Sequence, residues 1–217
     1  MNSTRHRQIF NALVKKYGKD MVPSPGFLRV EQILSNNKGS YRFPIDTNSG
    51  QSQTELKLDR NDLFVVTDLA FYLLKEVSAM PGLNVLQTYP NETEFAAVVG
   101  PPAFTPGHLE AIYNGRFSLK IATKVNIEAM SMHAFRYVPE TQQSGATNKS
   151  EYSLDKAAYP LGSILYLKGN MDIEVKVEFN TFAGIAIEAV TAGQAHKIVF
   201  HPYGYLIKGG ANVQIQS

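Results

Sequence analysis

One stretch, residues 163–190, constrains the fold of this chain more than any other. Between positions 172 and 179 apolar residues alternate strictly with charged ones. Because a strand turns successive side chains to opposite faces, this alternation predicts a strand with one buried face and one face in water. The apolar members are Ile173, Val175, Val177 and Phe179, and the charged members are Asp172, Glu174, Lys176 and Glu178.

Short polar connections flank this strand on both sides. Gly169-Asn170 links it to the apolar run at 164–167, and residues 180–184 link it to a second run at 184–187. The pattern therefore predicts three strands of an antiparallel meander. Nothing in this half of the chain has helical periodicity, so we expect the buried face to pack on a second sheet, as in a β-sandwich.

The rest of the chain after residue 26 also consists of short apolar segments separated by turns. About a dozen strands with frequent turns are typical of a sandwich or a jelly roll. We expect a bulge near Thr123-Lys124, a single helical turn at 108–113, a rigid proline-rich loop at 100–107 and a long polar loop at 139–151. The remaining predicted strands lie at 27–34, 41–45, 55–58, 62–76, 85–88, 95–99, 116–127, 130–138, 197–200, 205–208 and 213–215. The run at 62–76 is compatible with a buried strand, a buried helix or both in sequence, and its β-branched and aromatic residues favour the strand.

Residues 4–18 are the one segment with clear helical periodicity. Ile9, Phe10, Leu13, Val14 and Tyr17 recur at helical spacing, and Gly18 follows them. We therefore expect a short amphipathic N-terminal helix. Prolines at 23 and 25 then interrupt the chain, so the predicted domains are an arm at 1–22 and a sandwich at 23–217, with two compact rolls as the alternative.

Positive charge is concentrated in this arm. Five cations stand against one acid, Asp20, so residues 1–20 carry +4 while the whole chain carries +2. The helix either packs on the body or meets anionic material, nucleic acid or lipid headgroups. The residues predicted to face a genome or membrane are Arg5, Arg7, Lys15, Lys16 and Lys19.

Several classes of chemistry lack support in the sequence. The chain has no Cys, which excludes disulfides, thiolate metal sites and a cysteine nucleophile. It also has no G-x-S-x-G elbow, no Walker A loop and no G-x-G-x-x-G motif. No apolar run approaches the roughly 20 residues that span a bilayer, and no signal peptide is visible, so we expect synthesis in the cytoplasm.

Candidate metal and sugar sites are weak. The loop at 46–50 resembles a calcium loop but has its glycine and acid at the wrong positions. His196 and His201 flank one predicted strand and could approach His133, although strand-end histidines are the simpler interpretation. Carboxylates at 172, 174 and 178 share the wet face of their strand and do not define a glycosidase pair. We expect no catalytic residue, no metal and no cofactor.

Three motifs carry a family resemblance: EAIYNGRFSL at 110–119, TDLAFY at 67–72 and YPN at 89–91. On these motifs the chain resembles jelly-roll coat proteins of tailless icosahedral bacteriophages. The motifs cover roughly residues 60–130, and the rest of the chain resembles the family only in its general character. The resemblance implies an eight-stranded sandwich that tiles a shell, with the N-terminal arm directed inward toward genome or internal membrane. It also implies location in the virion capsid and partners among other copies of the chain and other virion proteins.

The predicted fold is thus an all-β antiparallel sandwich of jelly-roll type with a short N-terminal amphipathic helix. The predicted function is that of a self-assembling structural virion protein without enzymatic activity. The alternative is a carbohydrate-binding β-sandwich module on a virion or cell surface. Tyr137, Tyr152, Tyr203 and Tyr205 would then line a sugar platform, although buried or edge tyrosines are the simpler interpretation. An enzyme with a dispersed site is the third interpretation. The size of the purified protein would separate the first two interpretations. A coat protein should form trimers, pentamers, hexamers or particles, whereas a carbohydrate-binding module should stay small.

Overall fold

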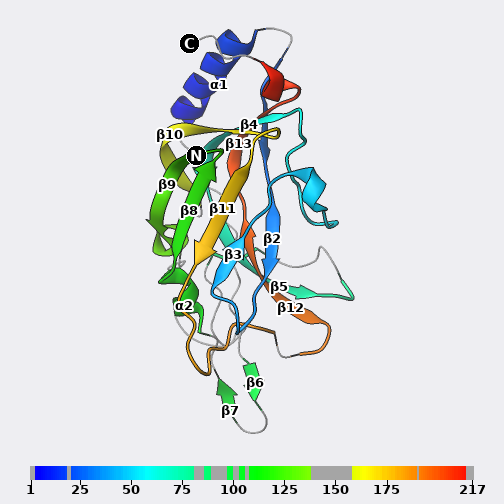
Figure 1. Cartoon of the computed structure of the whole chain (residues 1–217), viewed down its shortest axis with the longest axis vertical. Coiled ribbons are helices and arrows are strands. Elements are labelled where there is room, and N and C mark those ends of the chain that lie inside the picture. Colours follow the sequence, from blue (N-terminus) through cyan, green and yellow to red (C-terminus); the bar gives the residue numbers. More distant parts are fainter. Residues whose placement is uncertain are drawn as a thin grey trace.

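The structure is a computed structural model that describes residues 3–18, 21–80, 86–88, 97–99, 103–105, 108–137, 158–189 and 191–213. It is an elongated antiparallel sandwich with α1 at one end and the β6–β7 hairpin at the other (Figure 1). The elements are α1 (Ser3–Tyr17), β1 (Ser24–Phe27), β2 (Val30–Ile33), β3 (Ser40–Arg42), η1 (Thr47–Ser49), β4 (Leu63–Leu69), β5 (Phe71–Val77), β6 (Ala97–Val99), β7 (Ala103–Thr105), α2 (Leu109–Tyr113), β8 (Arg116–Ile121), β9 (Lys124–Ser131), η2 (Met132–Phe135), β10 (Tyr159–Lys168), β11 (Ile173–Glu178), β12 (Gln194–Phe200), β13 (Tyr203–Ile207) and η4 (Gly210–Asn212).

Three long strands of one sheet are each interrupted once, at the same level. β1 gives way to β2 after Leu28, β4 to β5 at Ala70, and β12 to β13 at His201-Pro202. Hydrogen bonds continue across the interruption, from Leu28 N to Pro202 O (3.0 Å) and from His201 N to Ala70 O (2.9 Å). These strands therefore form one continuous sheet with a crease, which we call the creased sheet.

Strand pairing identifies the topology. When the interrupted strands count as one each and the separate β6–β7 hairpin is left out, eight strands remain. The creased sheet contains the first, eighth, third and sixth of them in that order. The second sheet, here the exposed sheet, has the order β3-β11-β8-β9, which is second, seventh, fourth and fifth. First thus pairs with eighth, second with seventh, third with sixth and fourth with fifth. This is an antiparallel ribbon rolled up into a jelly roll, and the predicted fold class is confirmed.

An aromatic cluster fills the space between the sheets. Phe71 lies at its centre, with the rings of Phe43, Phe117, Phe135 and Phe200 at 5.0–5.7 Å between centroids. The alternation on β11 places Val175 and Val177 in this core, as the sequence predicted. Aromatic side chains are well suited to such a core because each buries a large apolar area.

The predicted meander is wrong in its pairing. β10 and β11 are consecutive and joined by the turn at Gly169-Asn170, but β10 pairs with β4 in the creased sheet and β11 with β3 and β8 in the exposed sheet. The tight turn therefore passes between the two layers. Local turn signals indicate where a strand ends, but the long-range pairing decides which sheet takes the next strand.

The predicted strand at 184–187 is also wrong. In this segment the Ala186 N–H donates to His108 Nδ1 (2.8 Å) and the Ile187 N–H donates to Asn36 Oδ1 (2.8 Å). Side chains thus occupy the backbone groups that a neighbouring strand would use, and the segment is irregular although it is buried.

The predicted bulge near Thr123-Lys124 is a hairpin turn. β8 and β9 pair with each other, and Ala122 adopts φ 52° in the turn between them. The segments at 55–58 and 85–88 form only isolated bridges within the described residues, at Leu56, Leu58 and Gln87. Residues 132–135 form η2 in place of a strand, and the proline-rich loop contains β7. The polar loop at 139–151 lies outside the described residues.

Candidate functional site

Helix α1 packs on the outer face of the creased sheet. Ile9 and Leu13 are buried in a cluster separate from the main core, and Phe10 and Tyr17 pack at its margin. The sheet residues in this cluster come from β4 and β13 and are Leu63, Val65, Tyr205 and Ile207. The apolar stripe predicted from the sequence is thus the surface by which the helix attaches to the body of the same chain.

Asp68 on β4 anchors the first turn of α1. His6 Nε2 lies 3.3 Å and Arg5 Nη1 3.8 Å from its carboxylate oxygens, while Thr67 Oγ1 donates to it at 2.6 Å. Arg5 also donates to the carbonyls of Thr67 and Leu161. The Asp68 side chain is almost fully buried, so these partners satisfy a charge that water does not reach.

The predicted arm cations separate into two groups. Arg5 is turned inward to Asp68, whereas Arg7, Lys15 and Lys16 are exposed on the helix. Lys16 Nζ lies 5.1 Å from the centroid of the Tyr166 ring on β10, a cation–π contact. Lys19 lies outside the described residues. α1 therefore presents three cations to solvent while its opposite face is buried.

Four exposed apolar side chains lie along the β1–β2 edge of the creased sheet. Val22 precedes β1, Phe27 ends it, Ile33 ends β2, and Leu56 pairs with Arg29 between the two strands. Their exposed fractions are 65%, 42%, 61% and 44%. Sequence reasoning missed this edge, because the apolar residues at 27 and 33 were assigned to one continuous strand without regard to its place in the sheet.

Part of the backbone of this edge, at Arg29 and Glu31, is already hydrogen-bonded. Arg29 and Leu56 exchange two backbone hydrogen bonds (2.8 and 2.9 Å), and the Glu31 N–H donates to Glu55 Oε1 at 3.0 Å. A covered edge resists strand addition from another chain. Contact with a partner along this edge would therefore be made by side chains.

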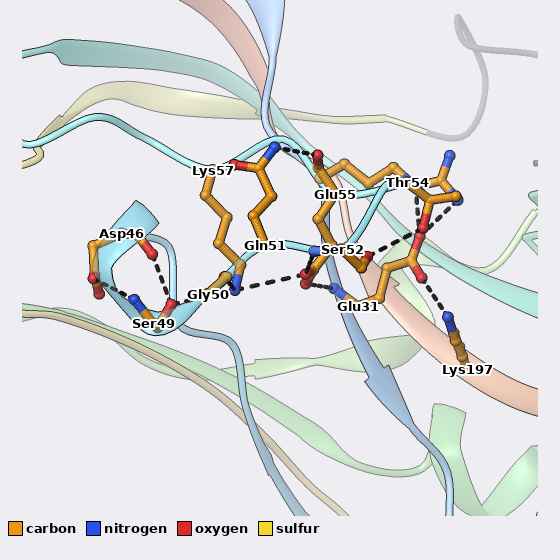
Figure 2. Close-up of polar contacts among 11 residues, drawn as sticks. Glu31, Asp46, Ser49, Gly50, Gln51, Ser52, Thr54, Glu55, Lys57 and Lys197 are labelled. Carbon is orange, nitrogen blue, oxygen red and sulfur yellow. Dashed lines mark hydrogen bonds and ion pairs between the residues drawn. The ribbon is translucent and has the colours of Figure 1, made fainter.

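The loop that resembles a calcium site holds a lysine (Figure 2). Lys57, almost fully buried, donates to Ser49 Oγ at 3.2 Å and to the Gly50 carbonyl. The Asp46 carboxylate caps η1 by accepting from the Ser49 N–H at 3.1 Å. The oxygens of this loop thus surround an ammonium group of the protein itself.

Beside this loop lies a buried ion network on the outer face of β2, β12 and β5 (Figure 2). Lys197 Nζ lies 2.9 Å from Glu31 Oε2 and 2.6 Å from Glu76 Oε2, and Arg29 Nη2 lies 2.7 Å from Glu31 Oε1. Burial alone would raise the pKa of Glu31, but Lys197 and Arg29 outweigh it and hold the pKa below its ordinary value. The network joins the loop at 46–57 to the sheet.

The three histidines considered as a metal site are not brought together. His133 is exposed and lies 2.9 Å from Asn114 Oδ1, while His196 is buried and donates to the Ile187 carbonyl at 2.9 Å. His201 lies among aromatic rings at the crease. In the described part of the chain no group of three or more His, Asp or Glu side chains could hold a metal ion.

Of the tyrosines considered for a sugar platform, Tyr137 is half-buried. Tyr203 and Tyr205 are buried, with hydroxyls bonded to Tyr72 (2.9 Å) and to the His6 carbonyl (3.0 Å). Tyr152 lies outside the described residues. A surface hollow of about 440 Å³ lies where β3 ends beside β11, and its polar lining is Gln32, Arg42, Asp46, Asp172 and Glu174.

Comparison of the chain with family models, with curated proteins and with solved structures finds no match. The resemblance to phage coat proteins therefore stays a prediction from the sequence. No helix in the described ranges is long and apolar enough to cross a membrane.

Proposed function

We propose that this protein is a self-assembling coat subunit of a tailless icosahedral phage. Jelly rolls serve as capsid proteins, as lectins and as metal-binding cupin enzymes. A cupin needs a cluster of metal ligands, which the described residues do not form. A lectin platform needs exposed aromatic rings, and two of the four candidate tyrosines are buried.

The observation that carries the proposal is the apolar edge formed by Val22, Phe27, Ile33 and Leu56. Apolar side chains exposed in a row are typical of surfaces that contact another protein. We propose that this edge packs against a second copy of the chain. Because the backbone groups of Arg29 and Glu31 in the middle of this edge are already paired, we propose that the contact is made by side chains.

The exposed cations of α1 supply the second contact in this proposal. Arg7, Lys15 and Lys16 lie on the outward face of a helix fixed to the body, and so they present a rigid basic surface. We propose that this surface faces the packaged nucleic acid. Such binding should weaken steeply with salt because phosphate contacts release counterions. Binding to anionic vesicles with no binding to DNA would instead assign the helix to an internal membrane.

Sedimentation and electron microscopy of the purified protein test the assembly proposal. We expect closed particles or ring-shaped oligomers for the natural sequence and loss of assembly for Ile33→Lys. Val125→Lys is the matched control, because Val125 is similarly exposed, at 53%, but lies on β9 at the far edge of the exposed sheet. A protein that stays monomeric overturns the proposal, and binding of a sugar by that monomer would favour the carbohydrate-binding alternative.

A further inference from the structure

The side chains of the apolar edge are arranged symmetrically about Val30, which is itself buried in the core. Because side chains alternate along a strand, the residues at odd positions on either side of it face outward. Arg29 and Glu31 each lie one position from Val30. Phe27 and Ile33 each lie three positions from it. In both directions along the edge the outward order is therefore a charged side chain and then an apolar one.

The exposed side chains of this edge are held in place by the protein itself. The ring of Phe27 stacks on His201 at 4.7 Å between centroids, with 19° between the ring planes. Leu56 exchanges two backbone hydrogen bonds with Arg29 (2.8 and 2.9 Å) and so lies close to the centre of the edge. Side chains that are already ordered lose little conformational entropy when they bind. The edge is thus preorganised for a contact.

The described part of the chain offers this edge no second apolar surface to pack against. Apart from the edge, β9 and β10 and three different connections each carry one large exposed apolar side chain. These residues are Met80, Val125, Tyr159, Met171 and Phe182. A head-to-tail contact needs two different surfaces that fit each other, whereas a two-fold contact needs one surface that fits itself. The distribution of apolar side chains therefore favours a two-fold contact.

Charge also fits a contact of this edge with itself. Residues 27–33 and 55–57 contain two cations, Arg29 and Lys57, and two acids, Glu31 and Glu55, so their net charge is zero. Arg29 Nη2 lies 2.7 Å from Glu31 Oε1, and Lys57 Nζ lies 3.7 Å from Glu55 Oε2. A two-fold axis reverses the direction of the second copy, so Arg29 of one copy faces the Glu31 side of the other. The two copies thus meet with complementary charges.

We propose that the apolar edge binds the same edge of a second copy about a two-fold axis close to Val30. In this contact Phe27 of each copy packs against Ile33 of the other, and the two Leu56 side chains meet beside the axis. The inference rests on the proposed contact between copies and adds its symmetry and its register. Because a two-fold contact is complete with two chains, any larger particle must use a further surface.

Single cysteines and a short bismaleimide cross-linker test the symmetry, because the chain has no Cys of its own. A Cys in place of Leu56 can be linked only to the same Cys of another copy. On denaturing gels we expect at least about tenfold more cross-linked dimer from Leu56→Cys than from Val125→Cys, since only the first position lies at the axis. Leu56 is exposed, so its replacement should leave the fold intact by circular dichroism.

A mixing experiment tests the register. Phe27→Cys and Ile33→Cys proteins that carry tags of different size are mixed before cross-linking. We expect linked dimers that contain one chain of each kind, while either protein alone should give only the background of Val125→Cys. In the mixed dimer the second contact between Phe27 and Ile33 keeps its natural residues, so the substitutions do not remove both contacts at once.

The outcomes separate this inference from the proposed coat function. Particles or rings in which the Leu56→Cys chains stay unlinked overturn the two-fold contact and leave coat assembly standing, and so does a mixture that yields no mixed dimer. Linked dimers that build nothing larger support the two-fold contact and contradict the coat function. If the cysteine variants do not fold, sedimentation velocity of the natural protein decides. Two chains as the smallest associated species support the inference, whereas three or more, or a monomer at every concentration, overturn it.

Discussion

The two sheets of the roll bury their side chains in different ways. On β4 of the creased sheet all seven residues are buried, whereas on β11 of the exposed sheet the buried residues alternate with partly exposed ones. The cause is the covering of the outer face: α1 covers β4 and β13, while the outer face of β11 has no covering layer among the described elements. A continuous apolar run thus marks a strand between two layers, and an alternating run marks a strand with one wet face.

Ion pairs follow the same division. On the creased sheet Glu31, Lys197 and Glu76 form a network shielded from water. On the exposed sheet Glu178 accepts from Lys176 and Arg116, and its side chain is partly open to solvent. Similar chemical groups on the outer faces of the two sheets should therefore differ widely in their effect on stability.

The largest effect is expected where the two sheets meet in the core. Val177 on β11 is fully buried, so Val177→Asp places an uncompensated charge in the core at a cost of several kcal/mol against a total stability of about 5–15 kcal/mol. We expect no soluble folded protein. Glu178→Lys, one residue along on the wet face, should fold normally by circular dichroism. Equal tolerance of both changes would show that the face of β11 is misassigned.

A smaller effect should separate the two outer faces. Lys197→Met leaves Glu31 and Glu76 without the cation between them, and breaking such a buried pair costs about 3–5 kcal/mol. Lys176→Met makes the same chemical change on the exposed sheet and should have little effect on urea unfolding. A Lys197→Met variant as stable as the Lys176→Met variant would mean that the network contributes nothing.

The comparison also shows how much of the fold the sequence predicts. The alternation at 172–179 predicted β11. The apolar run at 62–76 favoured a strand, and it forms β4 and β5, although the break at Ala70 was not predicted. The helical spacing of apolar residues at 9–17 likewise predicted α1 and its apolar face, while packing on the body was one of two interpretations. These signals are local, and they were sufficient for the fold class.

The errors arose where distant groups determine the backbone. The segment at 184–187 has the apolar pattern of a strand, but Asn36, about 150 positions earlier, takes its N–H groups. The β8–β9 turn uses Ala122 at positive φ, where a sequence signal would require Gly or Asn. The contact of Arg5 with Asp68 joins positions too far apart for any local pattern to indicate. The candidate site could therefore be predicted only as a basic arm.

The smallest expected effect separates two histidines. His201 is buried in the creased sheet, and His133 is exposed next to the exposed sheet. His201 lies at the crease, with its ring stacked on Phe27 at 4.7 Å between centroids and its Nδ1 without a hydrogen-bond partner. Burial, with a contribution from Arg29, lowers the pKa of His201 to about 4. Since the unfolded side chain titrates near 6.5, the native state binds fewer protons below that pH. Stability is therefore complete above about pH 6.5 and is lost as the pH falls toward 4.

From these two pKa values, the free energy of unfolding should fall by about 2 kcal/mol between pH 8 and pH 5. Urea unfolding at pH 8, 6.5 and 5 measures the change. His201→Phe replaces the ring with an apolar one of similar shape and should remove most of the slope, while His196, whose pKa burial also lowers, retains part of it. His133→Asn alters an exposed ring and should leave the slope intact. A slope unchanged in His201→Phe would show that the crease does not hold a neutral histidine, and the contrast between the two sheets would then not extend to their titrating groups.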